Sequence, residues 1–282
     1  MIPGRFSVVV IAKNEADNIE RCLRSITRSD DVVLVDDCSE DQTARIARKL
    51  GARVLPHRFE SFAQQRNWAM EHAGVKHPWV LMLDADEALT PRAERAIADA
   101  IESACDDTAG FLMCRKTIFL DRWLRYSDGF PVWIMRLVRP DRARFVDSGH
   151  GEVPSPPVDG VLGTIREPLL HYPFSRGLSD WLARHNDYST REAAMETETH
   201  LPWTWREILL GHGPEQRKAL RNLGRRLAFR PLLRFCHHYF IHRGFMDGRA
   251  GLAFSLLMAG YEGMIVLKRR ERELQQRSHA GR

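Results

Sequence analysis

A short apolar run that ends in carboxylates constrains this chain more than any other feature. Residues 80–83 read Val-Leu-Met-Leu, and the sequence Asp84-Ala-Asp86-Glu87 follows directly. Four consecutive apolar residues predict a strand that is covered on both faces of a sheet. In open α/β sheets, ligands bind beyond the carboxyl ends of such strands. The sequence therefore predicts a ligand site at Asp84 and Asp86.

The two carboxylates suit a divalent cation. Mg²⁺ and Mn²⁺ take oxygen ligands, and proteins commonly hold them with one or two carboxylates together with the phosphates of a substrate. A nucleotide diphosphate would supply those phosphates. A solvated turn is the alternative interpretation, because Asp is frequent in turns.

Strands and helices alternate before this run. The predicted strands cover residues 6–11, 32–35 and 53–55, and the predicted helices cover 17–26, 44–50 and a segment around 64–67. This alternation predicts an α/β fold with a doubly wound, mostly parallel sheet and flanking helices. Polar clusters fall at the strand ends, where such a sheet binds its ligands.

Four polar motifs follow the predicted strands. In chain order they are Lys13-Asn14-Glu15, Asp36-Asp37-Cys-Ser39-Glu-Asp41-Gln-Thr43, Gln65-Arg66-Asn67 and Asp84-Ala-Asp86-Glu87. Together these motifs resemble those of family 2 glycosyltransferases with the GT-A fold. The resemblance implies transfer of a sugar from a nucleotide-sugar with inversion at the anomeric carbon. It also implies that the first two strand ends hold the base and ribose, and that the last motif holds Mg²⁺ or Mn²⁺ on the diphosphate.

Each candidate for the donor site has a structural alternative. Asn14 and Glu15 are predicted to line the base pocket, although acids also favour the start of a helix. Asp36 and Asp37 are predicted to accept hydrogen bonds from the base or ribose, although Asp is also a common helix N-cap. Arg66 is predicted to bind phosphate or base carbonyls with its guanidinium, and a solvated helix face is its alternative.

A general base is predicted in the middle of the chain. Inversion requires a carboxylate that removes the proton of the acceptor hydroxyl during attack. Residues 146–153 read Val-Asp-Ser-Gly-His-Gly-Glu-Val, whereas the resembling subgroup has His-Glu here, so one glycine is inserted. Glu152 is the predicted base, His150 its orienting neighbour and Asp147 the reserve. An exposed hairpin residue is the alternative for Glu152.

Three further basic side chains are predicted to lie near the diphosphate of the nucleotide-sugar. His171 is predicted to complete the ligand shell of the metal or to contact the diphosphate, and a structural histidine is its alternative. Arg136 and Arg139 are predicted to neutralise diphosphate charge. A basic strand edge is the alternative for both arginines.

The chain changes character near residue 175. A helix is predicted over 179–195, and residues 217–235 interleave basic and apolar side chains, which is typical of helices on membrane surfaces. Nucleic acid is the competing partner for such a stretch and is not expected here. Residues 251–267 are the most apolar, but they contain Glu262 and fall short of a span of about 20 residues. We expect an interfacial or buried helix there.

The predicted organisation is a GT-A domain over 1–175 that binds nucleotide-sugar, and a helical extension over 176–282 for the acceptor and the membrane surface. Residues 231–252 resemble the tail of bacterial lipopolysaccharide core glycosyltransferases. This resemblance implies transfer of a hexose, usually glucose from UDP-glucose, to an inner-core heptose of a lipid-anchored acceptor.

Cysteine usage and charge bear on location. The five cysteines are scattered, odd in number and without metal-site spacing, and we find no signal peptide, so a reduced cytoplasmic environment is predicted. Much of the net charge of +5 falls after residue 200, which favours an anionic membrane or lipid acceptor. The expected location is peripheral, on the cytoplasmic leaflet of the inner membrane.

Two other functions remain open at this stage. A polyprenyl-phosphate glycosyltransferase would share the fold and the donor chemistry, and its lipid phosphate acceptor would need no strong base. A noncatalytic binding protein on a transferase fold is the other alternative, because a fold alone does not fix function.

Overall fold

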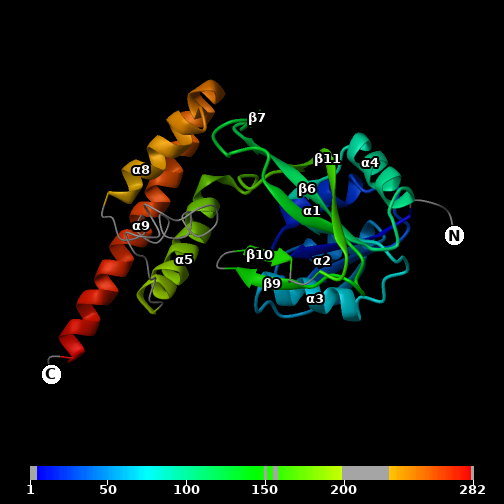
Figure 1. The fold of residues 1–282 in the computed structure, drawn as a ribbon. Helices are drawn as coiled ribbons and strands as arrows, with labels where there is room; N and C mark the ends of the chain where they lie inside the picture. The colour runs from blue at the N-terminus through cyan, green and yellow to red at the C-terminus, as the bar shows by residue number, and fades with distance from the viewer. Residues whose placement is uncertain (1–4, 149–150, 155–157, 199–228, 281–282) are drawn as a thin grey trace. The chain divides into compact units, whose positions relative to one another are not determined.

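The computed structural model describes residues 5–148, 151–154, 158–198 and 229–280 (Figure 1). The chain forms two compact units. The sheet unit consists of Met1–Trp123 and Phe130–Arg176, and the helical unit consists of Leu124–Gly129 and Gly177–Arg282. The chain therefore passes from one unit to the other three times.

Four parallel strands form the first half of the main sheet, in the order β3-β2-β1-β4. Their register aligns Ile11 with Asp84 and Ala12 with Asp36, so three strands end at one edge of the sheet. These strands are β1 (Ser7–Ala12), β2 (Val32–Asp36), β3 (Arg53–Pro56) and β4 (Val80–Asp84). The parallel half confirms the strands predicted at 6–11, 32–35, 53–55 and 80–83.

The sheet continues beyond β4 in mixed orientation, in the order β8-β6-β11-β5. β8 is antiparallel to both β4 and β6, β11 is parallel to β6, and β5 is antiparallel to β11. A short strand, β7, pairs with the end of β6. The bounds are β5 (Glu87–Ala88), β6 (Thr108–Phe119), β7 (Arg122–Trp123), β8 (Trp133–Val138) and β11 (Val161–His171).

Helices cover both faces of the parallel half. Successive side chains of a strand point to opposite faces, and in β1 the side chains of Val8 and Val10 join one core while that of Val9 joins the other. The first core includes side chains of α1, α2 and α4, and the second includes side chains of α3. The helices are α1 (Ala16–Arg24), α2 (Thr43–Lys49), α3 (Phe62–His72) and α4 (Pro91–Glu102).

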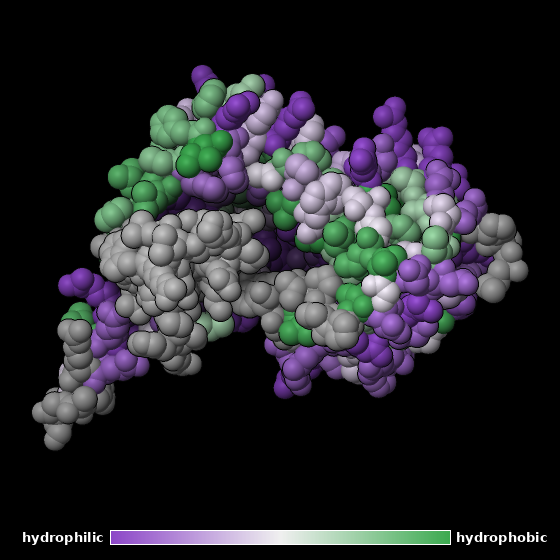
Figure 2. Space-filling view, viewed as in Figure 1, coloured by the Kyte–Doolittle hydropathy of each residue, from purple (hydrophilic) through white to green (hydrophobic). Residues whose placement is uncertain are grey.

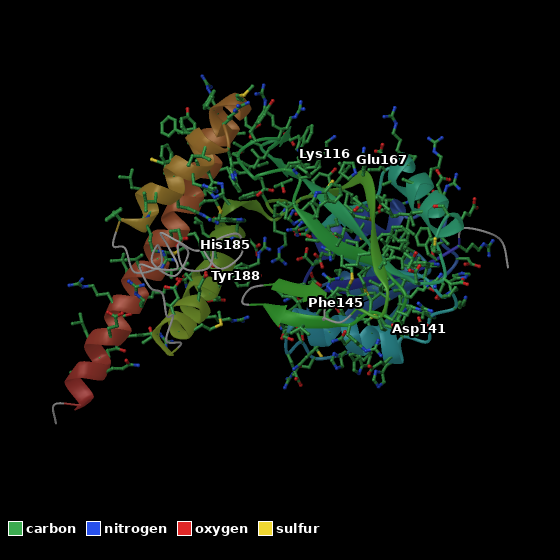
Figure 3. All side chains as sticks on the ribbon, viewed as in Figure 1. Lys116, Asp141, Phe145, Glu167, His185 and Tyr188 are labelled. Atoms are coloured by element: carbon green, nitrogen blue, oxygen red, sulfur yellow. The ribbon has the colours of Figure 1, made fainter. Side chains whose placement is uncertain are left out.

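A separate two-stranded hairpin packs on α3. It consists of β9 (Phe145–Ser148) and β10 (Gly151–Pro154), and its register places Glu152 opposite Asp147. Phe145 is buried among the side chains of α3 and lies at the start of the hairpin (Figure 3).

The helical unit contains α5 (Gly177–Glu198), α8 (Arg230–Cys236) and α9 (Gly248–Ala280). Between α8 and α9 lie a π-helical turn, η1 (His237–Ile241), and a 3₁₀ turn, η2 (Gly244–Asp247). The helices predicted at 179–195 and 251–267 are confirmed, and α9 extends well beyond its prediction. Most of the stretch predicted as an amphipathic helix at 217–235 lies outside the described residues.

Polar contacts join α9 to its neighbours. Arg230 of α8 binds Glu262 of α9 at 2.6 Å and Glu196 of α5 at 2.9 Å. Tyr261 donates a hydrogen bond to Glu192 at 2.9 Å, and Lys268 donates to the Asn186 side chain at 2.7 Å. These contacts place polar groups inside the unit along the length of α9.

One helix within the described residues is long and apolar enough to cross a membrane. It covers Gly244–Gln276, and the mean hydropathy of its most apolar window is 1.6. The criterion concerns length and composition alone.

Candidate active site

The turn after β4 is held between two strands of the sheet. The Ala85 N–H donates to the carbonyl of Ile11 at 3.2 Å, and the Tyr172 N–H donates to the carbonyl of Asp86 at 2.8 Å. The first bond fixes the turn to the end of β1, and the second fixes it to the residue after β11. The position of the Asp84 and Asp86 side chains therefore depends on strands that are distant in the sequence.

Asp84 is bound by two buried arginines. Its Oδ1 accepts from Nη2 of Arg66 at 2.7 Å, and its Oδ2 accepts from Nη2 of Arg136 at 2.6 Å. The arginine side chains are only 1% and 2% exposed. Burial alone would raise the pKa of Asp84, but the charges of Arg136 and Arg66 outweigh it and hold the pKa far below its ordinary value. Asp84 is thus ionised and engaged on both oxygens.

The burial of Arg66 and Arg136 excludes the two structural alternatives that the sequence left open. Arg66 does not lie on a solvated helix face, and Arg136 does not form a basic strand edge. Contact of either guanidinium with a phosphate stays a prediction. Arg139 lies away from the turn, because it follows Val138, which pairs with the start of β4, and its guanidinium lies 4.7 Å from the Trp79 ring.

Glu87, for which no role was predicted, completes this network. It is fully buried, accepts from the Asp84 N–H at 3.0 Å and from Arg136 at 2.7 Å, and lies 3.9 Å from Arg115. Burial raises the pKa of Glu87, although Arg136 opposes the shift. The sequence did contain a signal for this role, because Glu87 is the third carboxylate within four residues. A third buried negative charge in one turn needs positively charged partners.

Asp86 lies beside His171. The Asp86 Oδ2 and the His171 Nε2 are 3.6 Å apart, because β5 pairs with the end of β11 and aligns Glu87 with His171. Burial would raise the pKa of Asp86, but the nearby His171 outweighs it and lowers the pKa. The two side chains are 16% and 15% exposed, so both can reach a ligand.

The donor set of this pair fits a metal that a substrate helps to hold. No group of three or more His, Cys, Asp and Glu side chains suited to a metal occurs in the part of the chain that the structure describes. Mg²⁺ and Mn²⁺ need fewer protein ligands when phosphates and water complete the shell. Asp86 and His171 offer two such ligands, whereas both oxygens of Asp84 bind arginine.

The ends of β1 and β2 are tied to each other. The Asn14 N–H donates to Ser39 at 2.8 Å, and the Asn14 side chain accepts from the Glu40 N–H at 2.8 Å. Asn14 adopts a left-handed conformation with φ of 52°, which Asn tolerates better than most residues. Glu15 lies 3.3 Å from Arg176. These contacts hold the two loops predicted to bind the base and ribose in one arrangement.

Asp36 and Asp37 have partners in the same loops. Asp36 accepts from the Ser39 N–H at 3.0 Å and from its hydroxyl at 2.5 Å. Asp37 accepts from Lys13 at 2.7 Å and from the Phe59 N–H at 2.9 Å. The predicted contacts of these carboxylates with a nucleotide are not tested by this arrangement.

The Gln65-Arg66-Asn67 motif joins α3 to three separate segments. Gln65 binds His57 after β3, with side chain atoms 2.7 Å apart. Arg66 binds Asp84 at the end of β4. The Asn67 side chain accepts from the Phe145 N–H and donates to its carbonyl, both at 2.9 Å. The motif therefore fixes the hairpin that carries the predicted base as well as the predicted metal turn.

The structure describes the predicted base only in part. Glu152 lies in β10, opposite Asp147 of β9, and its backbone is described. His150 lies outside the described residues. The roles of Glu152 and His150 stay predictions.

These features define an α/β protein whose polar site lies at the carboxyl ends of parallel strands, with an acidic turn suited to a substrate-bound cation. The chain belongs to glycosyl transferase family 2, whose model matches residues 7–151. This match confirms the family and the fold class predicted from the sequence.

Two curated relatives extend the comparison. A lipopolysaccharide core biosynthesis glycosyltransferase, LpsC, of Rhizobium meliloti (strain 1021) is 26% identical over 277 residues, covering 92% of each chain. An uncharacterized glycosyltransferase of Rickettsia bellii (strain RML369-C) is 35% identical over 103 residues. The second match spans 36% of this chain and only 33% of that relative.

Solved structures show a more distant likeness. Glucosyl-3-phosphoglycerate synthase from Mycobacterium tuberculosis, in complex with Mn²⁺, UDP and phosphoglyceric acid, is 15% identical with a TM-score of 0.44, covering 64% of this chain and 78% of that chain. Another mycobacterial protein is 15% identical with a TM-score of 0.47, covering 68% and 74%. Likeness at this level has no bearing on ligands.

Proposed function

We propose that this family 2 enzyme transfers a hexose from a UDP-sugar, with inversion, to a lipid-anchored saccharide of a lipopolysaccharide precursor. The observation that carries the proposal is the Asp86–His171 pair at the edge where parallel strands end. The Rhizobium relative, which matches over nearly the whole chain, supports lipopolysaccharide as the product class. We infer glucose as the hexose and an inner-core heptose as the acceptor from the resemblance of the C-terminal pattern.

In this proposal the tied loops after β1 and β2 bind the nucleoside. Asn14 and Glu15 face the base, and Asp36 or Asp37 accepts from the base or the ribose. The bonds between these loops support the assignment, because a rigid pocket loses less entropy when it binds a ligand.

Asp86 and His171 would hold Mg²⁺ or Mn²⁺ against the donor diphosphate. A metal ion bound there offsets the negative charge that develops on the leaving diphosphate. Asp84 has a different task in this scheme: held by Arg66 and Arg136, it fixes the turn from which Asp86 projects. Metal dependence and the choice of metal belong to the proposal.

Glu152 is the proposed general base. It would take the proton of the acceptor hydroxyl while that oxygen attacks the anomeric carbon from the face opposite the diphosphate. An α-linked donor would then give a β-linked product. Two neighbouring residues of α3 support this role. Asn67 binds the hairpin that carries Glu152, and Arg66 binds Asp84 in the acidic turn.

The enzyme is proposed to work in the cytoplasm, peripherally associated with the inner membrane. Polar bonds from Tyr261, Glu262 and Lys268 to other helices of the unit favour an α9 that packs within the protein over one surrounded by lipid.

A panel of thermal shifts tests the donor site. UDP-glucose, other UDP-sugars, GDP-mannose and UDP are each added with and without Mn²⁺ to the wild type and to Asp86→Ala. A ligand that binds only the folded state raises Tm. We expect one UDP-sugar to give a metal-dependent shift that Asp86→Ala loses.

The exposed Asp99 on α4 provides a matched control, because Asp99→Ala also removes one carboxylate and should keep the full shift. If no nucleotide shifts Tm, the protein is not a nucleotide-sugar transferase and the noncatalytic alternative stands. An equal shift in wild type and Asp86→Ala would exclude Asp86 as the metal ligand.

A further inference from the structure

A group of exposed apolar side chains lies where α8 passes through η1 and η2 into α9. We call this group the apolar corner. Exposed fractions range from 45% at Leu233 to 70% at Ile241, and Figure 2 shows hydrophobic surface over α8 and the start of α9. The members are Phe229, Leu232, Leu233, Phe240, Ile241, Phe245 and Met246.

Ring contacts link Phe240 and Phe245 of the corner through the half-buried Tyr239. The Tyr239 ring lies 5.2 Å from that of Phe235, 5.1 Å from that of Phe240 and 6.2 Å from that of Phe245. Aromatic rings therefore run from α8 through η1 to η2. Single exposed apolar residues are normal on a protein surface, whereas a contiguous group marks an interaction site.

The exposed charge within residues 229–261, which contain the corner, is positive. Arg243 and Arg249 are exposed and Arg234 is half-buried. Asp247 is the only carboxylate between residues 229 and 261. It is 8% exposed and accepts hydrogen bonds from the backbone N–H groups of residues 125–127. Its charge is thus directed into the helical unit.

We propose that the apolar corner binds the surface of an anionic lipid bilayer. The apolar side chains would lie at the boundary of headgroups and acyl chains, and Arg243 and Arg249 would contact lipid phosphates. This inference deepens the proposed function, because it assigns the membrane partner to specific residues. Phe229, Leu232 and Leu233 belong to the end of the stretch 217–235 on which the sequence prediction rested, whereas the other four members of the corner follow that stretch.

Charge complementarity decides between a bilayer and the other occupants of such a surface. A second copy of this chain would bring like charges together, since residues 229–261 of each copy carry exposed arginines and their one carboxylate, Asp247, is buried. An anionic bilayer offers both an apolar layer and negative phosphates. Insertion of α9 across the bilayer would expose the paired Glu262 and Arg230 to lipid, which is energetically costly. Binding of the bilayer surface by the corner avoids this cost.

Vesicle cosedimentation of the full chain tests the proposal. The vesicles contain phosphatidylcholine with or without phosphatidylglycerol, and the variants are Phe240→Ser/Ile241→Ser and Arg243→Gln/Arg249→Gln. We expect the first variant to bind phosphatidylglycerol vesicles at least about tenfold more weakly, because two exposed apolar side chains no longer insert. The second should lose affinity by roughly tenfold or more and lose most of its salt dependence.

Leu267→Ser/Leu274→Ser is the matched control, since both leucines are highly exposed on α9 outside the corner, and it should bind as the wild type does. Equal binding by wild type and both corner variants would overturn the proposal. So would a wild type that ignores vesicles and dimerises in sedimentation velocity, because the corner would then join two copies.

The thermal shift with UDP-sugar separates this inference from the proposed function. A corner variant that keeps the donor shift but loses vesicle binding supports the corner as a membrane surface. A wild type that binds vesicles through the corner but shows no donor shift would leave the membrane surface in place and refute the transferase proposal.

Discussion

At the scale of the residue, Asp84 and Asp86 have different environments although they share one motif. Asp84 binds two buried arginines, whereas Asp86 has a single, longer contact of 3.6 Å with His171. The bonds of the first carboxylate assign it to the stability of the fold, and the second is the one that we propose binds the metal. A sequence motif alone gives both positions the same role.

This difference predicts unequal losses of stability. Asp84→Asn removes the carboxylate that binds two buried guanidinium groups, of which Arg136 keeps a second carboxylate, Glu87. We expect the free energy of unfolding to fall by about 3–5 kcal/mol. Asp86→Asn should lower it by about 1 kcal/mol or less, because only one long contact to His171 changes. Urea unfolding of both variants measures the two losses. Equal losses would contradict the separation of roles.

The proposed base gives a second prediction at this scale. Glu152→Gln should keep the thermal shift with UDP-sugar and reduce transfer to the acceptor by about 10²–10⁴-fold, the usual contribution of a general base. The exposed Asp141, which precedes the same hairpin, supplies the control: Asp141→Asn should transfer normally.

Transfer that survives in Glu152→Gln would remove this residue from the base role. Full activity of the same variant with a purified polyprenyl phosphate would instead favour the polyprenyl-phosphate alternative, whose acceptor is already ionised.

At the scale of the element, strands of the parallel half follow from local sequence. Residues 6–11, 32–35 and 80–83 are apolar runs rich in Val, Ile and Leu, and such runs form strands buried on both faces. Because these strands are parallel and end at one edge of the sheet, the polar residues that follow them lie at that edge. Fold class and the location of the acidic turn were therefore predictable.

Other features depend on pairings that no local pattern specifies. β11 was not predicted, since Gly163 and Pro168 interrupt its pattern; a side chain at Gly163 would meet the Phe111 ring, and the register shifts between Ile165 and Leu169. His171 reaches Asp86 only through the pairing of β11 with β5. The burial of Arg66 likewise required tertiary structure.

The segment Leu124–Gly129 shows how an element outside regular structure is held. Asp247 accepts from three of its backbone N–H groups and from the Ser127 hydroxyl. The His238 Nδ1 lies 2.6 Å from the Ser127 carbonyl, which requires a proton on that nitrogen. Burial lowers the pKa of His238 to about 4, so this histidine is neutral near neutral pH.

This histidine predicts a pH dependence of stability. Between the unfolded pKa near 6.5 and the folded value of about 4, the unfolded state binds more protons, so stability rises with pH in this window. Falling pH should remove as much as about 3 kcal/mol across it. Unfolding measured from pH 7 to pH 4 should show a shallower decline in His238→Gln, while the exposed His72→Gln keeps the wild-type slope. Identical slopes in all three proteins would contradict the assignment.

At the scale of the whole molecule, composition predicted two regions of different character. The change near residue 175 coincides with the point where the chain enters the helical unit for the second time, at Gly177. Its first entry, at Leu124, carries no compositional signal, because only six residues are involved. The short segment belongs to the helical unit because it is bonded to Asp247 and His238, which are more than 100 residues away in the sequence.

The three passages of the chain between the units have a consequence for how such enzymes can diversify. A helical extension that began at Gly177 and stood alone could be exchanged by one recombination event to suit another acceptor. Here the same exchange would also remove Asp247 and His238, so residues 124–129 would lose the groups that bind them. A replacement C-terminal region would therefore have to supply its own bonding partners for that six-residue segment.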